Sequence, residues 1–299
     1  MEIEHAVSVS NHLGEGPIWH QTEQRLYWVD ATNNSYLTLE PSTGKVERND
    51  VGRFTISVAF CDNGKLLVAT DTELTYWDPR SRTSELIATG SFDAGAVRFN
   101  DGKVDPAGRY FIGTMHRVEN MPLGGLYRLT AHGDFSQVEW NITTSNGLGW
   151  SPDGLKLYYT DSIRKAIYRY DYDRESGAIA NREVLIDSQE EDGVPDGLAV
   201  DSEGCIWSAR FNGWNVTRYD PNGKKIVTLR APVAKPTSCT FGGANLQDLY
   251  ITTARYGLDE AHLGKFPQSG DLFVCHTGVR GQIERSFSRA RVPLPRWTR

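Results

Sequence analysis

The sequence predicts an all-β protein, a six-bladed β-propeller with four antiparallel strands in each blade. A phrase that ends in a tight turn closed by Gly occurs four times, as AFCDNG, KVDPAG, GWSPDG and AVDSEG. Weaker copies bracket these, GPIWHQTEQRLYWVD near the start and TSCTFGGANLQDLYITT near the end. Six units of short strands are typical of a propeller, whereas a β-sandwich has no reason to repeat six times.

The spacing of the units supports the same architecture. The predicted equivalent positions of the six units are Ile18, Val58, Lys103, Leu148, Leu198 and Cys239. The steps between them are 40, 45, 45, 50 and 41 residues, the length that four short strands and their turns require. Abundant aromatic residues and Gly, with 8 Trp, 13 Tyr and only 3 Met, also favour sheets over helical bundles.

Each Gly-closed turn is followed by strand-like segments in a fixed order. Gly accepts the positive φ that such turns need. The second strands of the units are KLLVAT, RYFIGT, KLYYTD and CIWSAR, and the third strands are LTYWDP, GLYRLT, AIYRYDYD and NVTRYDP. REVLID and KKIVTLRA are examples of fourth strands. The N-terminal EHAVSV is expected to add the outer strand of the last blade, which closes the ring and removes exposed edges.

Composition limits the domain organisation and the partners. The 299 residues show no linker and no shift in composition, so we expect one domain over 1–299, with 287–299 as a short tail. A net charge of −6 without a basic stripe argues against nucleic acid. The sequence shows neither a signal peptide nor a membrane-spanning run, and its four cysteines form no C-x-x-C pair. We expect a cytoplasmic monomer with reduced, mostly buried thiols, although one disulfide stays open.

Oxygen-bearing side chains recur where the units begin. Glu15, Asn100, Asn146 and Asp196 occupy four of the six openings, and Thr or Ser occupies the other two. The innermost strands of a propeller run side by side around the axis, so their starts gather at one mouth of the channel. Carboxylates and amides that converge there favour a hard divalent cation such as Ca²⁺, Mg²⁺ or Mn²⁺.

A simpler interpretation applies to each of these residues alone. Asn, Asp and Gly also begin strands because they form turns. Glu15, in GEGP, fits this interpretation poorly because Glu is a poor turn residue. We therefore interpret the set of four as a site.

Five stretches resemble the signature segments of one known family, in the family's order. They are GEGPIW, RFNDGKVDPAGRYFIGTM, SNGLGWSPDG, VPDGLAVDSEG and CTFGGANLQDLYITTAR. They resemble those of the SMP-30/gluconolactonase/luciferin-regenerating-enzyme-like (regucalcin) family, from about residue 10 to about residue 285. The resemblance implies a six-bladed propeller with one divalent metal in its channel.

Carried over motif by motif, the resemblance implies a role for each residue of the site. The metal ligands would be Glu15, Asn146 and Asp196, with Asp196 also the general base. Arg98 and Asn100 would bind substrate. A further substrate-contacting acid usually follows GTM in the family, and in GTMHRVENMP only Glu119 is available for that role.

The implied reaction is hydrolysis of a sugar lactone, such as gluconolactone, arabinonolactone or xylonolactone, to the aldonic acid. Ca²⁺ is the first expectation for the metal, with Mg²⁺, Mn²⁺, Zn²⁺ or Fe²⁺ as alternatives. Trp150 and Trp214 can stack on a sugar, but core packing is the preferred interpretation of both. No G-x-S-x-G elbow supports a serine mechanism.

Other functions stay open at this stage. The same scaffold can hydrolyse aryl esters or phosphotriesters, and the same ligands would serve a calcium-binding regulatory protein. A protein-interaction platform ranks lowest, because it would not need acids and amides gathered at one mouth.

Overall fold

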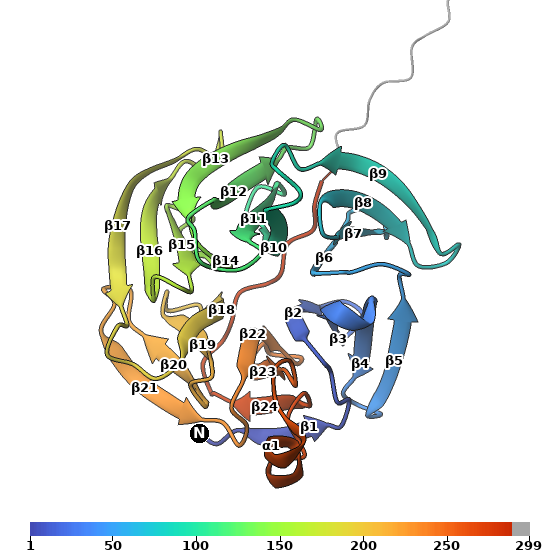
Figure 1. Ribbon diagram of the computed structural model, residues 1–299, viewed down its shortest axis with the longest axis vertical. Helices are drawn as coiled ribbons and strands as arrows, with labels where there is room; N and C mark the ends of the chain where they lie inside the picture. The colour runs from blue at the N-terminus through green and yellow to red at the C-terminus, as the bar shows by residue number, and fades with distance from the viewer. Residues whose placement is uncertain (289–299) are drawn as a thin grey trace, which may run out of the picture.

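The computed structural model describes residues 1–288 and confirms the predicted architecture (Figure 1). Six four-stranded antiparallel sheets surround a central axis, and each sheet is one blade. From the innermost to the outermost strand, the blades comprise β2 (Gly14–His20), β3 (Arg25–Asp30), β4 (Ser35–Glu40) and β5 (Lys45–Asp50); β6 (Ser57–Phe60), β7 (Leu66–Ala69), β8 (Glu73–Asp78) and β9 (Thr83–Thr89); β10 (Val97–Val104), β11 (Tyr110–His116), β12 (Gly124–Leu129) and β13 (Phe135–Ile142); β14 (Ser145–Trp150), β15 (Lys156–Asp161), β16 (Ala166–Tyr172) and β17 (Ile179–Asp187); β18 (Val194–Val200), β19 (Ile206–Phe211), β20 (Asn215–Tyr219) and β21 (Lys225–Arg230); and β22 (Pro236–Gly242), β23 (Asp248–Thr253), β24 (Leu272–His276) and β1 (Glu4–Val7).

The six repeat units predicted from the sequence correspond to the six blades. All six residues taken as equivalent lie in innermost strands, namely β2, β6, β10, β14, β18 and β22. The N-terminal strand β1 closes the last blade, as expected, by pairing with β24 through Glu4 opposite Val274 and His5 opposite Phe273. The ring is therefore closed by joining the two ends of the chain in one sheet.

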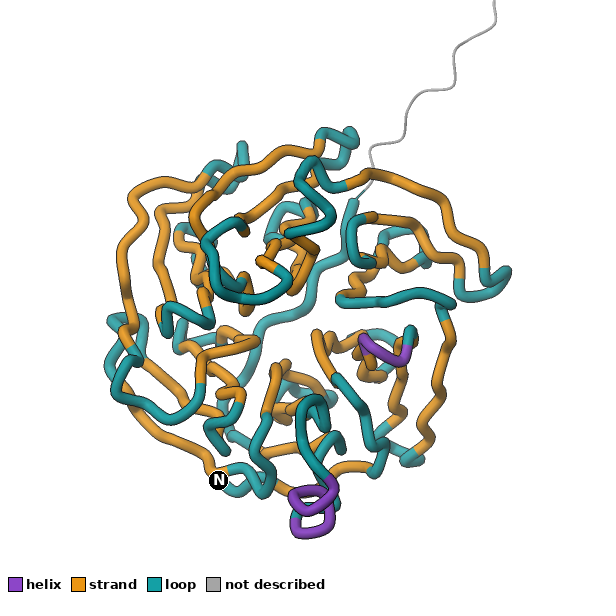
Figure 2. Tube along the Cα trace, in the orientation of Figure 1, coloured by secondary structure: helices purple, strands orange, loops and turns teal. Residues whose placement is uncertain are grey.

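Helix is scarce and lies in the connections between strands (Figure 2). One 3-10 turn spans Ala31–Asn33, and one short helix, α1, spans Glu260–Lys265. No helix in the described part of the chain is long and apolar enough to cross a membrane.

The hydrophobic core lies between and within the blades, where the inner strands are buried on both faces. β7 is buried at every position, whereas the outer strand β5 is mostly exposed. Trp150 packs against Phe111 at 5.5 Å between ring centres, and Trp214 packs against Phe266 at 4.7 Å. Both tryptophans therefore serve packing. The cysteines are buried and free of disulfides, as expected for reduced thiols.

A strap formed by residues 278–288 crosses the ring at the end where the innermost strands finish (Figure 1). Gly281 N–H donates to the Leu246 carbonyl in the last blade at 2.7 Å. Farther along, Phe287 N–H donates to the Phe60 carbonyl in the second blade at 2.7 Å. Phe287 is only 1% exposed. The strap therefore ties together blades that lie far apart along the chain.

The strap also bears on the predicted tail, 287–299. Only Phe287 and Ser288 of that range are among the described residues, and both are fastened to the ring. Ser288 N–H donates to the Gly108 carbonyl at 3.0 Å. The remainder of the range, 289–299, lies outside the described residues.

Candidate metal and active site

The three predicted metal ligands and Asn100, predicted to bind substrate, lie inside the innermost strands. Glu15 lies in β2, Asn100 in β10, Asn146 in β14 and Asp196 in β18. These residues therefore lie near the starts of the strands and not in the turns that precede them. Each of the four strands also has a shift of pairing register at this point. Such bulges re-aim a side chain next to active sites.

Glycines that follow the ligands let neighbouring innermost strands approach closely. A Cβ added at Gly147 would lie 2.7 Å from the carbonyl oxygen of Asp196. A Cβ at Gly197 would lie 2.0 Å from the Ser238 hydroxyl. Only Gly fits such contacts without displacing a neighbour. The repeated Asn-Gly and Asp-Gly pairs therefore hold Asn146 and Asp196 close together on adjacent blades.

Two amides are oriented by a short hydrogen-bond network. Asn100 Nδ2 donates to the Ser145 carbonyl at 2.7 Å and to Asn146 Oδ1 at 2.9 Å. Asn146 Nδ2 donates to the Ser162 hydroxyl at 2.8 Å. With its nitrogen occupied, Asn146 has a fixed Oδ1 with one lone pair still available to a ligand.

The carboxylates of the site are poorly satisfied by the protein. Asp196 is 5% exposed, and its Oδ1 has no hydrogen-bond partner among the described residues. Burial, followed by the negative charges of Glu15 and Asp101, raises the pKa of Asp196 well above its usual range. Desolvation in the channel and the charge of Asp101 raise the pKa of Glu15 to about 8.

These observations test whether a divalent cation fits the site. Glu15, Asn146 and Asp196 offer two carboxylates and one amide oxygen, which are hard ligands suited to Ca²⁺ or Mg²⁺. A buried carboxylate oxygen without a partner is costly unless a proton or a cation satisfies it. The residues present therefore fit one divalent ion.

Arg98 lies beside the ligands with part of its guanidinium available. Its Nη1 donates to the Phe99 carbonyl at 2.8 Å and to Asn100 Oδ1 at 2.9 Å. The guanidinium also stacks over the ring of Phe54, 5.4 Å from its centre. The described hydrogen bonds do not use Nη2 or Nε, so these donors can reach a bound molecule.

Glu119 lies on the exposed loop between β11 and β12. It has a positive φ of 56°, which is uncommon for a residue with a side chain. The charge of Glu119 adds to the raised pKa of Asp196 and opposes the lowered pKa of Arg98. The charge of Glu119 is therefore felt by both Asp196 and Arg98. The neighbouring Arg117 instead forms an ion pair with Asp71.

Sequence reasoning missed Asp101. Its negative charge raises the pKa of both Glu15 and Asp196, and burial raises its own pKa to about 6. Successive residues of a regular strand face opposite sides, so Asn100 and Asp101 were not expected to act on one site. The register shift between Phe99 and Gly102 removes that alternation. The only sequence signal was the adjacent pair of polar residues in FND.

A second acidic group, Asp201 with Glu203 and Cys205, lies at the turn after β18. Arg218 Nη2 contacts Asp201 Oδ2 at 2.7 Å and Glu203 Oε2 at 2.6 Å. Asp201 also accepts hydrogen bonds from Trp207 Nε1 and two backbone N–H groups. Asp201 is thus satisfied by protein donors, and Glu203 is solvated and shares Arg218, so neither carboxylate needs a cation.

The chain is similar in sequence to proteins of one known family. Residues 13–255 match the model of the SMP-30/Gluconolactonase/LRE-like region. Regucalcin of Xenopus laevis is 37% identical over 299 residues, covering 96% of this chain and 99% of the relative.

Two solved structures agree with the fold. A calcium-binding protein, regucalcin, from Agrobacterium tumefaciens has a TM-score of 0.91 and 28% identity, covering 95% of this chain and 96% of that one. A luciferin-regenerating enzyme has a TM-score of 0.88 and 30% identity, covering 96% of this chain and 99% of that one. The chain belongs to the SMP-30/gluconolactonase/luciferin-regenerating-enzyme-like family.

Proposed function

We propose that the protein hydrolyses a sugar lactone to its aldonic acid, with one divalent metal ion held by Glu15, Asn146 and Asp196. The observation that carries the proposal is the buried Asp196 carboxylate, whose Oδ1 has no partner among residues 1–288. Burial in the same channel and the charge of Asp101 also disfavour the ionised form of Glu15 and raise its pKa. Family membership supports the choice of reaction, because the family's description includes gluconolactonase.

The metal ion supplies Lewis acidity when bound, which polarises an ester carbonyl and lowers the pKa of water. Two carboxylates nearly balance a divalent charge, so the ligand set of Glu15, Asn146 and Asp196 leaves the centre close to neutral. A neutral sugar lactone can then enter without a large electrostatic penalty.

The side chains of the chain itself orient the lactone and move the proton. Arg98 offers a fork of donors to sugar hydroxyls or to the ring oxygen, and its contact with Asn100 fixes its direction. The Asp196 carboxylate oxygen that does not hold the metal would accept the proton as water adds to the lactone carbonyl carbon, and would return it to the ring oxygen as the ring C–O bond breaks. The amide of Asn100 orients Arg98 and Asn146 through its hydrogen bonds, and Glu119 contributes a further acceptor from the rim.

The direct test is a lactone panel on metal-stripped protein. Gluconolactone, arabinonolactone and xylonolactone are offered after chelation, and Ca²⁺, Mg²⁺, Mn²⁺, Zn²⁺ or Fe²⁺ is then restored one at a time. We expect no hydrolysis above background without metal and recovery with at least one ion, Ca²⁺ first. Turnover of aryl esters or phosphotriesters that exceeds turnover of every lactone would overturn the substrate assignment.

A second candidate function is calcium binding for regulation. It is favoured by the Agrobacterium relative, which is described as a calcium-binding protein. The two functions use the same ligands and separate in the Asp196→Ala variant. Loss of both metal binding and lactone hydrolysis supports the hydrolase. Hydrolysis that survives while calcium binding disappears supports the regulatory function.

A further inference from the structure

We propose that a second, basic cavity at the far end of the channel binds a small oxyanion, a phosphate or a carboxylate. The cavity lies where the innermost strands finish, whereas Glu15, Asn146 and Asp196 lie where those strands begin. The proposal concerns binding alone and does not depend on the proposed lactonase reaction.

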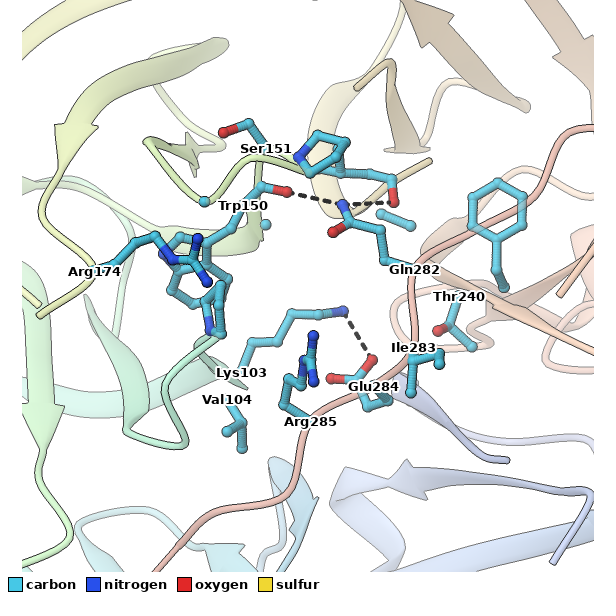
Figure 3. A pocket seen from close by; sticks show the side chains of 17 residues that line it. Lys103, Val104, Trp150, Ser151, Arg174, Thr240, Gln282, Ile283, Glu284 and Arg285 are labelled. Atoms are coloured by element: carbon cyan, nitrogen blue, oxygen red, sulfur yellow. Dashed lines mark hydrogen bonds and ion pairs between the residues drawn. The ribbon is translucent and has the colours of Figure 1, made fainter. Parts of the chain in front are cut away.

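The cavity has defined walls and a volume of about 100 Å³ (Figure 3). Four innermost strands, β10, β14, β18 and β22, contribute their last residues to it. The strap forms another wall through Gln282, Ile283, Glu284 and Arg285. Arg174, from the connection after β16, completes one side. The site is therefore built from four blades and the C-terminal segment.

The walls are held in place before any ligand binds. Gln282 Nε2 donates to the Trp150 carbonyl at 2.9 Å and to the Val200 carbonyl at 3.3 Å (Figure 3). These bonds fasten the strap to two neighbouring blades at the edge of the cavity. A preorganised cavity loses little entropy on binding, which favours a small ligand.

The charge of the lining points to an anion. Three lining side chains are cationic and one is anionic, namely Lys103, Arg174, Arg285 and Glu284. This excess of two positive charges occurs in a chain whose net charge is −6. Lys103 Nζ lies 3.3 Å from Glu284 Oε2, so that pair is internally balanced. The excess belongs to the two guanidinium groups.

Both guanidinium groups keep donors available. Arg285 forms no hydrogen bond or ion pair with any residue in 1–288. Arg174 makes one long hydrogen bond, from Nη1 to the Asp153 carbonyl at 3.3 Å. Guanidinium donors match the oxygens of carboxylates and phosphates in pairs. Arg285 is therefore positioned as the main anchor, with Lys103 able to turn from Glu284 toward a ligand.

The size of the cavity is compatible with a small ligand. Its volume of about 100 Å³ accommodates inorganic phosphate or a simple carboxylate. A phosphate source and a carboxylate source share the chemistry of the site, so the experiment separates them.

The test measures binding of inorganic phosphate, and separately of acetate, to the metal-free full-length chain by isothermal titration calorimetry. We expect a single site for at least one of the two anions, and the tighter one identifies the source. Arg285→Gln should weaken it at least tenfold, since a charge-assisted hydrogen bond is lost. Arg280→Gln is the matched control, because it removes the same charge from the same strap outside the cavity, and it should leave the affinity unchanged.

Further variants locate the anion. Lys103→Met should also weaken binding. Arg285→Gln is expected to fold normally, because Arg285 is exposed and makes no contacts that the fold needs, so weaker binding in that variant reports on the site and not on misfolding. Arg98→Gln reports on the opposite mouth and should have no effect. Loss of binding in Arg98→Gln with retention in Arg285→Gln would place the anion at the mouth and overturn the proposal. Absence of binding for both anions would overturn it as well.

Discussion

Asp196 lies near the start of β18 and Asp201 directly follows its end, and both are buried. Asp201 accepts hydrogen bonds from Arg218, from Trp207 Nε1 and from the backbone N–H groups of Glu203 and Cys205. Asp196 Oδ1 accepts none within the described residues. Only one of these two buried carboxylates is satisfied by the protein.

The same difference separates the carboxylates at the two ends of the channel. At the far end, Asp105 is bonded to Arg109 and Tyr172, and Lys103 is paired with Glu284. At the mouth, Glu15 and Asp196 repel each other. Charges that are paired inside the protein stabilise the fold, whereas charges left unpaired create affinity for a ligand.

The largest effect is expected for Asp196→Asn. This change keeps the shape of the side chain and removes the acceptor of the proton, so kcat/KM for the preferred lactone should fall roughly 10²–10⁴-fold. The melting temperature of metal-free protein should not fall, because repulsion with Glu15 is relieved. Steady-state kinetics and thermal unfolding in chelator measure both. Full activity, or a clear loss of metal-free stability, would contradict the contrast.

Asp201→Asn should behave in the opposite way. It leaves the Arg218 guanidinium undercompensated and should lower the free energy of unfolding by about 3–5 kcal/mol. The kcat/KM of the folded fraction should not change, because Asp201 does not contact the mouth. Urea unfolding and kinetics at low temperature measure the two quantities. Wild-type stability together with lost activity would reverse the assigned roles.

Phe287→Ala tests the strap at the far end. Phe287 is almost fully buried in the core that includes Tyr76 and Phe60, so its removal should cost about 3–5 kcal/mol in unfolding free energy. Ile283→Ala is the control, because Ile283 is 51% exposed and should change stability by no more than about 0.5 kcal/mol. Equal effects in both variants would show that residue 287 behaves as part of a tail.

Gly147→Ala tests the close approach of two innermost strands at the mouth. The added Cβ would collide with the Asp196 carbonyl at 2.7 Å, which should cost about 1–3 kcal/mol and weaken metal binding. Gly264→Ala in α1 is the control, since no atom lies within 4 Å of its added Cβ. That control should be neutral or more stable by up to about 1 kcal/mol. Tight metal binding in Gly147→Ala would show that the close approach is not needed.

The metal-free protein should also show a dependence of stability on pH. The pKa of Glu15 is about 8 in the folded chain and 4.5 without burial, so the folded state binds more protons between these values. Stability should therefore fall as pH rises from 5 to 8. Thermal unfolding in chelator measures this slope, which Glu15→Gln should reduce and added Ca²⁺ should oppose. A rise of metal-free stability over the same range would contradict it.

Much of the candidate site could be predicted because the repeat shows which residues occupy equivalent positions in the blades. Glu15, Asn146 and Asp196 stand at matching places in their units, and the ring brings matching places together. Asp101 could not be predicted in the same way, because alternation along a strand assigns it to the side away from Asn100. The register shift between Phe99 and Gly102 interrupts that alternation, and the residue types in this stretch do not predict the shift.

The number of blades, the order of strands within each blade and the matching places of Glu15, Asn146 and Asp196 follow from the sequence alone. These are properties of short segments, and turn residues and alternating apolar residues encode them locally. The contacts of Gln282, Glu284 and Phe287 that close the far end of the channel became visible in the tertiary structure. Such contacts depend on the closure of the ring, which brings distant segments together, and no periodic pattern in the C-terminal segment encodes them.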